Sequence, residues 1–518
     1  MNITASRQKS KNFAWSAHAP IIILTCLIVG YIGAMMVLHV VNFNRFRYGF
    51  DLSFYEQSVW NTVHGRFLQV SATDFSSSLL GTDAILILAL IAPFYAVVPS
   101  PFTMLFLETL VVGLGALPIF WLARERLKNP WAGLLLAAAY LWLLPVQNAN
   151  LYEWRERPMA MGFWLWAFYF YQRGRFKTFG VFALLVLCCR PENGLVLAML
   201  ALYGFWQGYH RKWGWRFVLG PLVLGLVWFG VVVTLVIPLS STGHSFALAE
   251  NYGGLGQSPG DILKNLVTQP FHSLQIVFPS ASVTFDKLIY IPLLLLPFAF
   301  LPLGSPSLLL MTLPPLLLNI LSVRETQTNP YDYHYQGSVI PWLVFATIFT
   351  IEKLANFVLT KTKNRHVRFK LSQLTVGLSG LVLAFTLIVY LLGLYLTPAN
   401  NPFKVAGNNP FKKTFASSLR SDLALGEALL KEIPPDAPLA ISNLWADHVP
   451  MRPGLWLLGI RNLYSTHPTL NAQYVFVDQK QSTTPDDAAL INTLLHSPDW
   501  QTIDAQGAYI LLKRQTIP

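Results

Sequence analysis

Twelve long apolar runs, separated by short polar breaks, dominate this sequence and limit the folds that it can adopt. A bilayer core is about 30 Å thick and takes about 20 apolar residues as a helix, and only helices and closed barrels satisfy their backbone groups inside it. Charged residues make up 12% of the 518, about half of what a soluble domain carries. The sequence therefore predicts an α-helical polytopic membrane protein. The runs lie near residues 20–41, 84–99, 101–123, 131–147, 159–172, 178–189, 194–207, 217–239, 287–303, 305–323, 337–360 and 372–396.

Basic residues between the runs predict how the chain is threaded. Lys and Arg concentrate in cytoplasmic loops, so Arg7, Lys9 and Lys11 place the N-terminus in the cytoplasm. The later basic clusters share that side only if the run at 84–99 does not cross. That run is short and contains Pro93, so we expect an outer juxtamembrane or re-entrant hairpin. About 11 transmembrane helices remain, in a plasma (inner) membrane, with the C-terminus outside.

This threading divides the chain into three parts. Residues 1–19 form a cytoplasmic tail, and residues 20–396 form the transmembrane domain with outer loops at 42–100, 148–158, 240–286 and 324–336. Residues 397–518 have a different character, with helical periodicity at 413–432 and 485–496 and strand-like runs at 438–442, 474–478 and 508–512. We expect a small extracytoplasmic α/β domain there.

Charged side chains occupy the outer polar breaks, where such groups are costly and are usually kept for a task. We expect them to converge on an active site or a binding site. The carboxylates are Asp51, Glu56, Glu153, Glu156, Glu192 and Asp332, and the basic groups among them are Arg155, Arg157, Arg190, Arg324 and His334.

Asp51 follows the first span at the start of an amphipathic stretch. A carboxylate held at the membrane surface is suited to take a proton from an incoming hydroxyl, since partial burial raises its pKa toward a useful range. The alternative is structural, because an Asp in this position also caps a helix well. The other outer carboxylates favour the functional interpretation.

The remaining outer motifs each have a structural alternative. The four charges at 153–157 suit hydroxyl or metal binding by Glu153 and phosphate binding by Arg155, or they form a local salt bridge. Arg190 and Glu192 lie in a tight turn, and Asp332 and His334 lie between tyrosines that suit either sugar stacking or an aromatic belt. Glu153 and Asp332 are also candidate ligands for a divalent cation, Mg²⁺ or Mn²⁺.

Four further residues are weaker candidates, Asp74 and Asp83 in the first outer loop and Asp447 and His448 in the C-terminal domain. We expect the last two in a solvated loop. The net charge of +12 reflects basic loops between spans and does not indicate nucleic acid. The sequence contains no P-loop, no G-x-S-x-G or H-E-x-x-H motif and no dinucleotide fingerprint.

Several motifs carry a family resemblance. The first-loop stretch at 50–61, followed by His64–Phe67, resembles the signature of a family of bacterial and archaeal polytopic proteins with a domain of unknown function. Further matches are at 94–101, 150–153, 190–194, 333–335 with 340–341, and 474–478. That family is similar to the GT-C glycosyltransferases.

The resemblance implies that Asp51, in the first outer loop, is the catalytic base and that Glu153 matches a second acidic motif. The function implied is inverting transfer of a sugar from a polyprenyl-phosphate donor in the membrane to a glycan, lipid or protein acceptor. The substrate- or phosphate-binding candidates are then Glu56, Glu153, Arg155, Arg190, Glu192, Arg324, Asp332 and His334. A transporter or lipid-handling scaffold without transfer chemistry is the alternative, although inverted repeats, common in transporters, are not evident.

Overall fold

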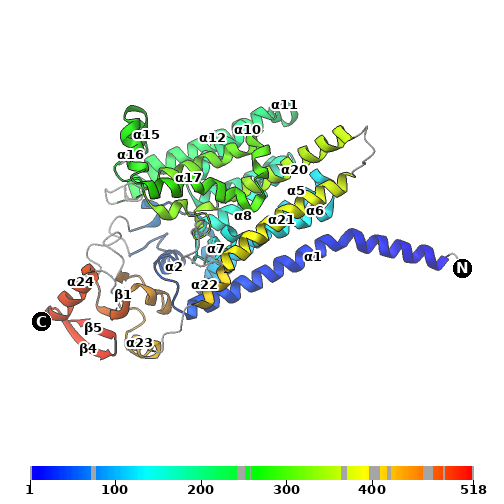
Figure 1. Cartoon of the computed structure of the whole chain (residues 1–518). Helices are drawn as coiled ribbons and strands as arrows, with labels where there is room; N and C mark the ends of the chain where they lie inside the picture. The colour runs from blue at the N-terminus through cyan, green and yellow to red at the C-terminus, as the bar shows by residue number, and fades with distance from the viewer. Residues whose placement is uncertain are drawn as a thin grey trace.

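The structure is a computed structural model. It describes residues 3–71, 77–241, 251–256, 258–362, 370–395, 409–416, 422–458, 471–481 and 485–515. A helical part makes up most of it, and a small sheet-containing domain lies at one end (Figure 1). Asp74 and the segments 398–402 and 363–369 lie outside the described residues.

Within these ranges, six helical segments are long and apolar enough to cross a membrane, or seven if the bent pair α6 (Pro130–Trp142) and α7 (Leu144–Asn150) is one span. The six are His18–Asn44 in α1 (Ile3–Asn44), Pro101–Leu127 in α4 (Pro101–Leu114) and α5 (Ala116–Leu127), Arg216–Ser240 from α12 (Arg216–Val231) to α13 (Ile237–Ser240), Ala281–Phe298 with α17 (Ala281–Leu295), Ile340–Lys361 in α20 (Ile340–Thr362) and Leu371–Gly393 in α21 (Leu371–Tyr395).

Shorter helices occupy the remaining predicted runs. They are α8 (Glu156–Gln172), α9 (Phe176–Cys189), α10 (Asn193–Trp206) and the segment Pro306–Leu321 with α18 (Pro306–Leu309) and α19 (Leu313–Leu321). The helical membrane-protein class is confirmed, and the number of crossings stays a prediction.

The run at 84–99 forms one short helix, α3 (Ile87–Val97). Its 11 residues span about 17 Å, roughly half of a bilayer core. α3 packs against α2 (Phe50–Val63), the helix that carries Asp51. The first outer loop is therefore built on a pair of packed helices.

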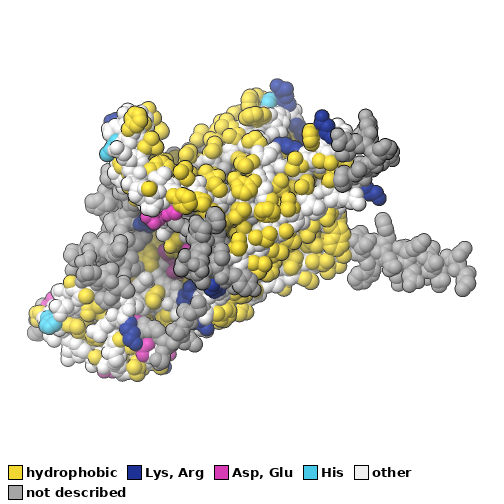
Figure 2. Space-filling model, in the orientation of Figure 1, with side chains coloured by type: hydrophobic (Ala, Val, Ile, Leu, Met, Phe, Trp, Pro, Cys, Tyr) yellow, Lys and Arg dark blue, Asp and Glu magenta, His cyan; other side chains and the backbone are white. Residues whose placement is uncertain are grey.

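Basic residues lie at the end of the helical part opposite the sheet domain. Figure 1 shows the N-terminal end of α1 and the short helix α11 (Tyr209–Trp213) at that end, and Figure 2 shows Lys and Arg side chains there beyond a largely apolar surface. Arg126 of α5 pairs with Glu352 of α20, and Arg173, in the α8–α9 turn, pairs with Glu125 of α5. These basic residues lie at the same end. Which side of a membrane this end faces stays a prediction.

Close helix packing explains one glycine of the 190–194 motif. A Cβ atom on Gly194 would lie 2.4 Å from the backbone oxygen of Gly225, and a Cβ on Gly225 would lie 2.3 Å from the oxygen of Gly194. α10 and α12 therefore touch through their backbones, and neither glycine tolerates a side chain.

The C-terminal domain holds a five-stranded sheet in the order β2-β1-β3-β5-β4. β1 (Leu439–Ser442) pairs in parallel with β2 (Leu455–Leu458) and β3 (Tyr474–Asp478), and β5 (Tyr509–Arg514) is antiparallel to β3 and β4 (Trp500–Gln506). α24 (Pro485–His496) covers the predicted helix at 485–496. α22 (Pro410–Ala416) and α23 (Leu423–Leu430) overlap the predicted helix at 413–432, and Asp422, just before α23, is not helical.

The sheet domain docks directly on the first outer loop. Ser71 donates its hydroxyl to the Leu455 carbonyl oxygen at 2.8 Å and accepts from the Leu455 amide at 2.9 Å. Gln57 of α2 donates to the carbonyl oxygens of Arg452 and Pro453. These contacts fix the domain against the helix that carries Asp51.

Candidate functional site

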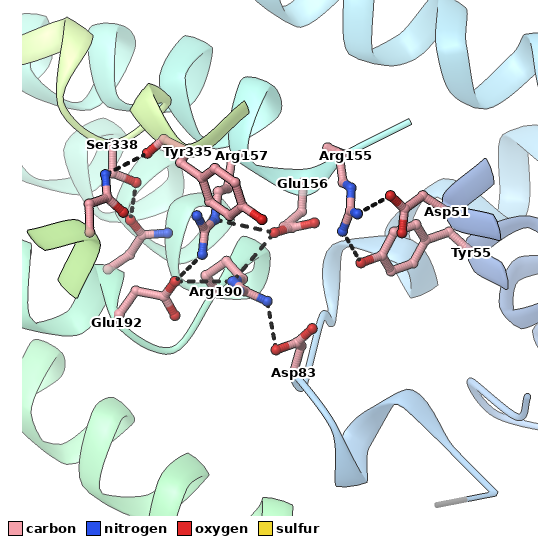
Figure 3. A network of polar contacts seen from close by, with 12 residues as sticks. Asp51, Tyr55, Asp83, Arg155, Glu156, Arg157, Arg190, Glu192, Tyr335 and Ser338 are labelled. Carbon is pink, nitrogen blue, oxygen red and sulfur yellow. Dashed lines mark hydrogen bonds and ion pairs between the residues drawn. The ribbon is translucent and has the colours of Figure 1, made fainter. Parts of the chain in front are cut away.

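Arg155 joins the first outer loop to the second. Its guanidinium forms an ion pair with Asp51 and donates to the Tyr55 hydroxyl at 2.9 Å (Figure 3). Asp51 and Tyr55 are four residues apart on α2 and so share a face. The Asp51 and Arg155 side chains are about one-seventh exposed. We call Asp51, Tyr55 and Arg155 the Asp51 cluster.

Glu153, not Asp51, caps α2. The helix begins after Gly49, and no side chain of its own segment caps it. Instead the Glu153 carboxylate accepts from the Leu52 amide at 2.8 Å. Glu153 takes a φ of 120°, a costly backbone conformation for a residue with a side chain. The helix-cap alternative for Asp51 is wrong, and burial, with the Asp51 charge nearby, raises the pKa of Glu153.

A second group, the Arg190 cluster, lies beside the first. It contains Asp83, Glu156, Arg157, Arg190 and Glu192 (Figure 3). Arg190 reaches Asp83 at 2.7 Å, Glu192 at 3.0 Å and Glu156 at 3.4 Å, and Arg157 reaches Glu192 at 3.2 Å. Burial alone would raise the pKa of Glu192, but the two guanidinium groups outweigh burial and hold that pKa below its ordinary value. The 190–192 turn is therefore part of an ionic network.

His334 lies close to both clusters. Its ring contacts those of Tyr152 and Tyr335, with centroids 4.9 and 4.4 Å away. Burial, together with the charges of Arg155, Arg157 and Arg190, lowers the pKa of His334 well below its ordinary value. The imidazole is therefore neutral at neutral pH. Its Nδ1 atom is buried without a hydrogen-bond partner in the described part of the chain.

Glu56 is buried at the contact between α2 and α3. It accepts a hydrogen bond from the Tyr95 hydroxyl at 2.7 Å. Burial raises the pKa of Glu56 to about 7, although this hydrogen bond lowers it in part. Glu56 thus titrates near neutral pH.

Asp332 and Arg324 lie outside both clusters as defined. Asp332 forms an ion pair with Lys413 and accepts from the Asn329 side chain. Arg324 precedes the short helix Glu325–Thr328. Its neighbour Val323 donates its backbone amide to the carbonyl oxygen of Asn251. Across the described residues, no three His, Cys, Asp or Glu side chains are grouped to hold a metal ion.

Comparison with known proteins places the chain in a family. The family described as predicted membrane protein (DUF2079) matches residues 44–511. The chain belongs to the DUF2079 family. This DUF2079 protein is also similar to the crystal structure of ArnT from Cupriavidus metallidurans in the apo state, with 14% identity over 94% of this chain and 98% of that one and a TM-score of 0.45. No curated protein matches it.

One buried carboxylate of this DUF2079 protein, Glu108, was not predicted from the sequence. Glu108 lies in α4 and is fully buried. It accepts from the Arg155 amide at 2.8 Å and from the Asn150 side chain at 3.4 Å. A Glu within the apolar run 101–123 was the available signal, since such residues are rare inside spans. Glu108 holds the backbone of the residue whose side chain binds Asp51.

The predicted solvated loop around Asp447 is also wrong for this DUF2079 protein. Asp447 and His448 end a short helix, Asn443–His448, that packs on α2. Asp447 is 6% exposed, and burial, with the charges of Glu153, Glu56 and Asp51, raises its pKa well above the ordinary value. His448 stacks on Phe46 at 3.7 Å. The sheet domain thus adds a carboxyl group beside α2.

Proposed function

We propose that this protein is a membrane glycosyltransferase of the GT-C type. It transfers a sugar from a polyprenyl-phosphate donor to an acceptor hydroxyl at the outer face of a plasma (inner) membrane. The observation that carries the proposal is the Arg155 guanidinium, which binds Asp51 and Tyr55 beside a second arginine cluster. A base and cationic groups at one rim are what transfer from a lipid phosphate requires.

In this proposal Asp51 takes the proton of the acceptor hydroxyl. The acceptor oxygen then bonds to the anomeric carbon, and the bond from that carbon to the phosphate oxygen breaks with inversion. The departing lipid phosphate keeps the electron pair, and Arg155 and Arg190 stabilise its charge. A base in place contributes about 10²–10⁴-fold in rate.

The other candidates take binding roles. Neutral His334 can donate a hydrogen bond to the phosphate from Nδ1, which has no hydrogen-bond partner among the described residues. Glu56, Glu192, Arg324 and Asp332 are proposed to contact sugar or acceptor groups. Glu153 acts through α2, because its carboxylate binds the Leu52 amide of the helix that carries Asp51.

The predicted Mg²⁺ or Mn²⁺ site does not fit these residues. The Glu153 carboxylate is engaged by a backbone amide, and Asp332 is paired with Lys413. Neither contributes to a three-ligand group among the residues described. We therefore derive no step through a metal ion.

The proposal includes a topology. About eleven segments cross the membrane, the N-terminus is cytoplasmic, and residues 397–518 are extracytoplasmic. The basic end opposite the sheet domain supports this orientation, since Lys and Arg favour cytoplasmic loops.

The experiment is a transfer assay with purified protein in lipid. A panel of polyprenyl-phosphate sugars is supplied with candidate acceptors, and free polyprenyl phosphate is measured as product. Release that depends on protein and acceptor supports the proposal. Donor binding without release from any panel member would instead support the transport or lipid-handling alternative.

A further inference from the structure

Two short helices of the outer loop 240–286 expose a large apolar face. They are α15 (Pro259–Thr268) and α16 (Pro270–Val277), at the sheet-domain end of the helical part (Figure 1). Leu263, Val267, Phe271 and Leu274 are between 53% and 82% exposed. Leu263 and Val267 are four residues apart on α15, and Phe271 and Leu274 are three apart on α16, so each helix has its two exposed side chains on one face.

The opposite face of the same pair is packed. Ile262 and Ile276 contact a small buried core of Tyr252, Leu255 and Val277. Among the described residues, both helices therefore have one face packed on the protein and one apolar face that is largely exposed. An amphipathic helix of this kind lies in a membrane interface with its apolar face toward the acyl chains.

The way the pair is attached to the rest of the protein indicates that its exposed face contacts a membrane surface. Lys287 of α17 donates to the carbonyl oxygens of Val277, Ile320 and Ser322, each at 2.8 Å. These bonds fix the end of α16 to the start of a predicted span. On α17, Phe285 and Leu288 are exposed apolar side chains of that span, as expected of a helix that faces lipid.

We propose that the α15–α16 pair lies in the outer leaflet and binds lipid through Leu263, Val267, Phe271 and Leu274. This inference does not depend on sugar transfer.

Site-specific fluorescence in lipid nanodiscs tests the proposal on the full-length protein. The native cysteines Cys26, Cys188 and Cys189 are replaced by alanine, and an environment-sensitive dye is attached to Phe271→Cys or Leu263→Cys. Lys264→Cys, on the same helix and also exposed, is the matched control. Brominated lipids and aqueous iodide serve as the two quenchers.

The proposal predicts that brominated lipid quenches the dyes at 271 and 263 several-fold more than the dye at 264, and that iodide shows the reverse order. Equal quenching of all three positions by iodide would overturn it. Protection of 271 and 263 from both quenchers would also overturn it, because a protein surface or a second copy would then cover this face.

Discussion

The carboxylate of Glu153 accepts a hydrogen bond from the backbone amide of Leu52 at 2.8 Å. The two residues are 101 positions apart, and this bond fixes the second outer loop on the first turn of α2. Two residues later, Arg155 binds Asp51 on the same turn. The strained backbone of Glu153 therefore brings a cap and a cation to one helix end.

Glu108 should act by positioning Arg155. Glu108→Leu removes the acceptor of the Arg155 amide, and an unsatisfied buried group costs about 1–3 kcal/mol. We expect kcat for transfer to fall about 10²-fold, because a misplacement of 1 Å has that effect, with little change in KM. Glu108→Gln keeps an acceptor oxygen and should retain most activity.

Hydrogen exchange provides a readout of the Glu108 prediction that does not depend on transfer. The amide of Arg155 should exchange faster in Glu108→Leu than in wild type and Glu108→Gln. Unchanged exchange in the Leu variant would rule out the positioning role, whatever the transfer assay gives.

Asp51 and Arg155 should be energetically coupled. A double-mutant cycle with Asp51→Asn and Arg155→Gln, followed by denaturant unfolding in mixed micelles, should give a coupling free energy of about 0.5–3 kcal/mol. Both side chains are largely buried, so solvent screens the pair only in part. Additive effects of the two substitutions would mean that the ion pair contributes nothing.

Glu56 should make stability depend on pH. Its pKa rises from the ordinary 4.5 to about 7 in the folded protein, so the folded chain keeps a proton that the unfolded chain loses. Stability should therefore fall as the pH rises from about 4.5 to 7, by about 3 kcal/mol from this group. Melting temperatures across that range should drop less steeply for Glu56→Gln; a wild-type slope in the variant would contradict the prediction.

Gly337 should be needed for the placement of Arg157. A Cβ atom there would lie 2.5 Å from the backbone oxygen of Arg157. Gly337→Ala should cost about 1–3 kcal/mol, as overpacking does. Gly380→Ala on α21 is the control, because a Cβ there meets no atom within 4 Å. Equal melting temperatures for both variants would refute the close contact.

The meeting of Asp51, Arg155, Arg190 and Glu192 could be predicted from the sequence. Charged residues at the ends of apolar runs are uncommon and usually functional. Alternate loops of a chain that crosses a membrane emerge on the same side. The pairing within the site could not be predicted. Arg155 pairs with Asp51, whereas Glu153 caps α2 from a positive-φ backbone that no sequence pattern specifies.

The burial of Asp447 could not be predicted from the sequence either. Its burial depends on the docking of the sheet domain through Ser71 and Leu455, which are 384 positions apart. No local pattern encodes that contact. Asp447 therefore resembled a surface residue of a loop, whereas the docked domain places it against α2.

The most direct test of the proposed function compares sugar transfer by wild type, Asp51→Asn and Asp422→Asn in lipid. Asp422 is an acidic residue of the sheet domain that pairs with Lys480, so its variant controls for loss of a carboxylate elsewhere. We predict that the Asp51 variant folds, binds donor and transfers at least about 10²-fold more slowly, and that the Asp422 variant matches wild type. Transfer at the wild-type rate by folded Asp51→Asn would contradict the assignment of the base and the site built around it.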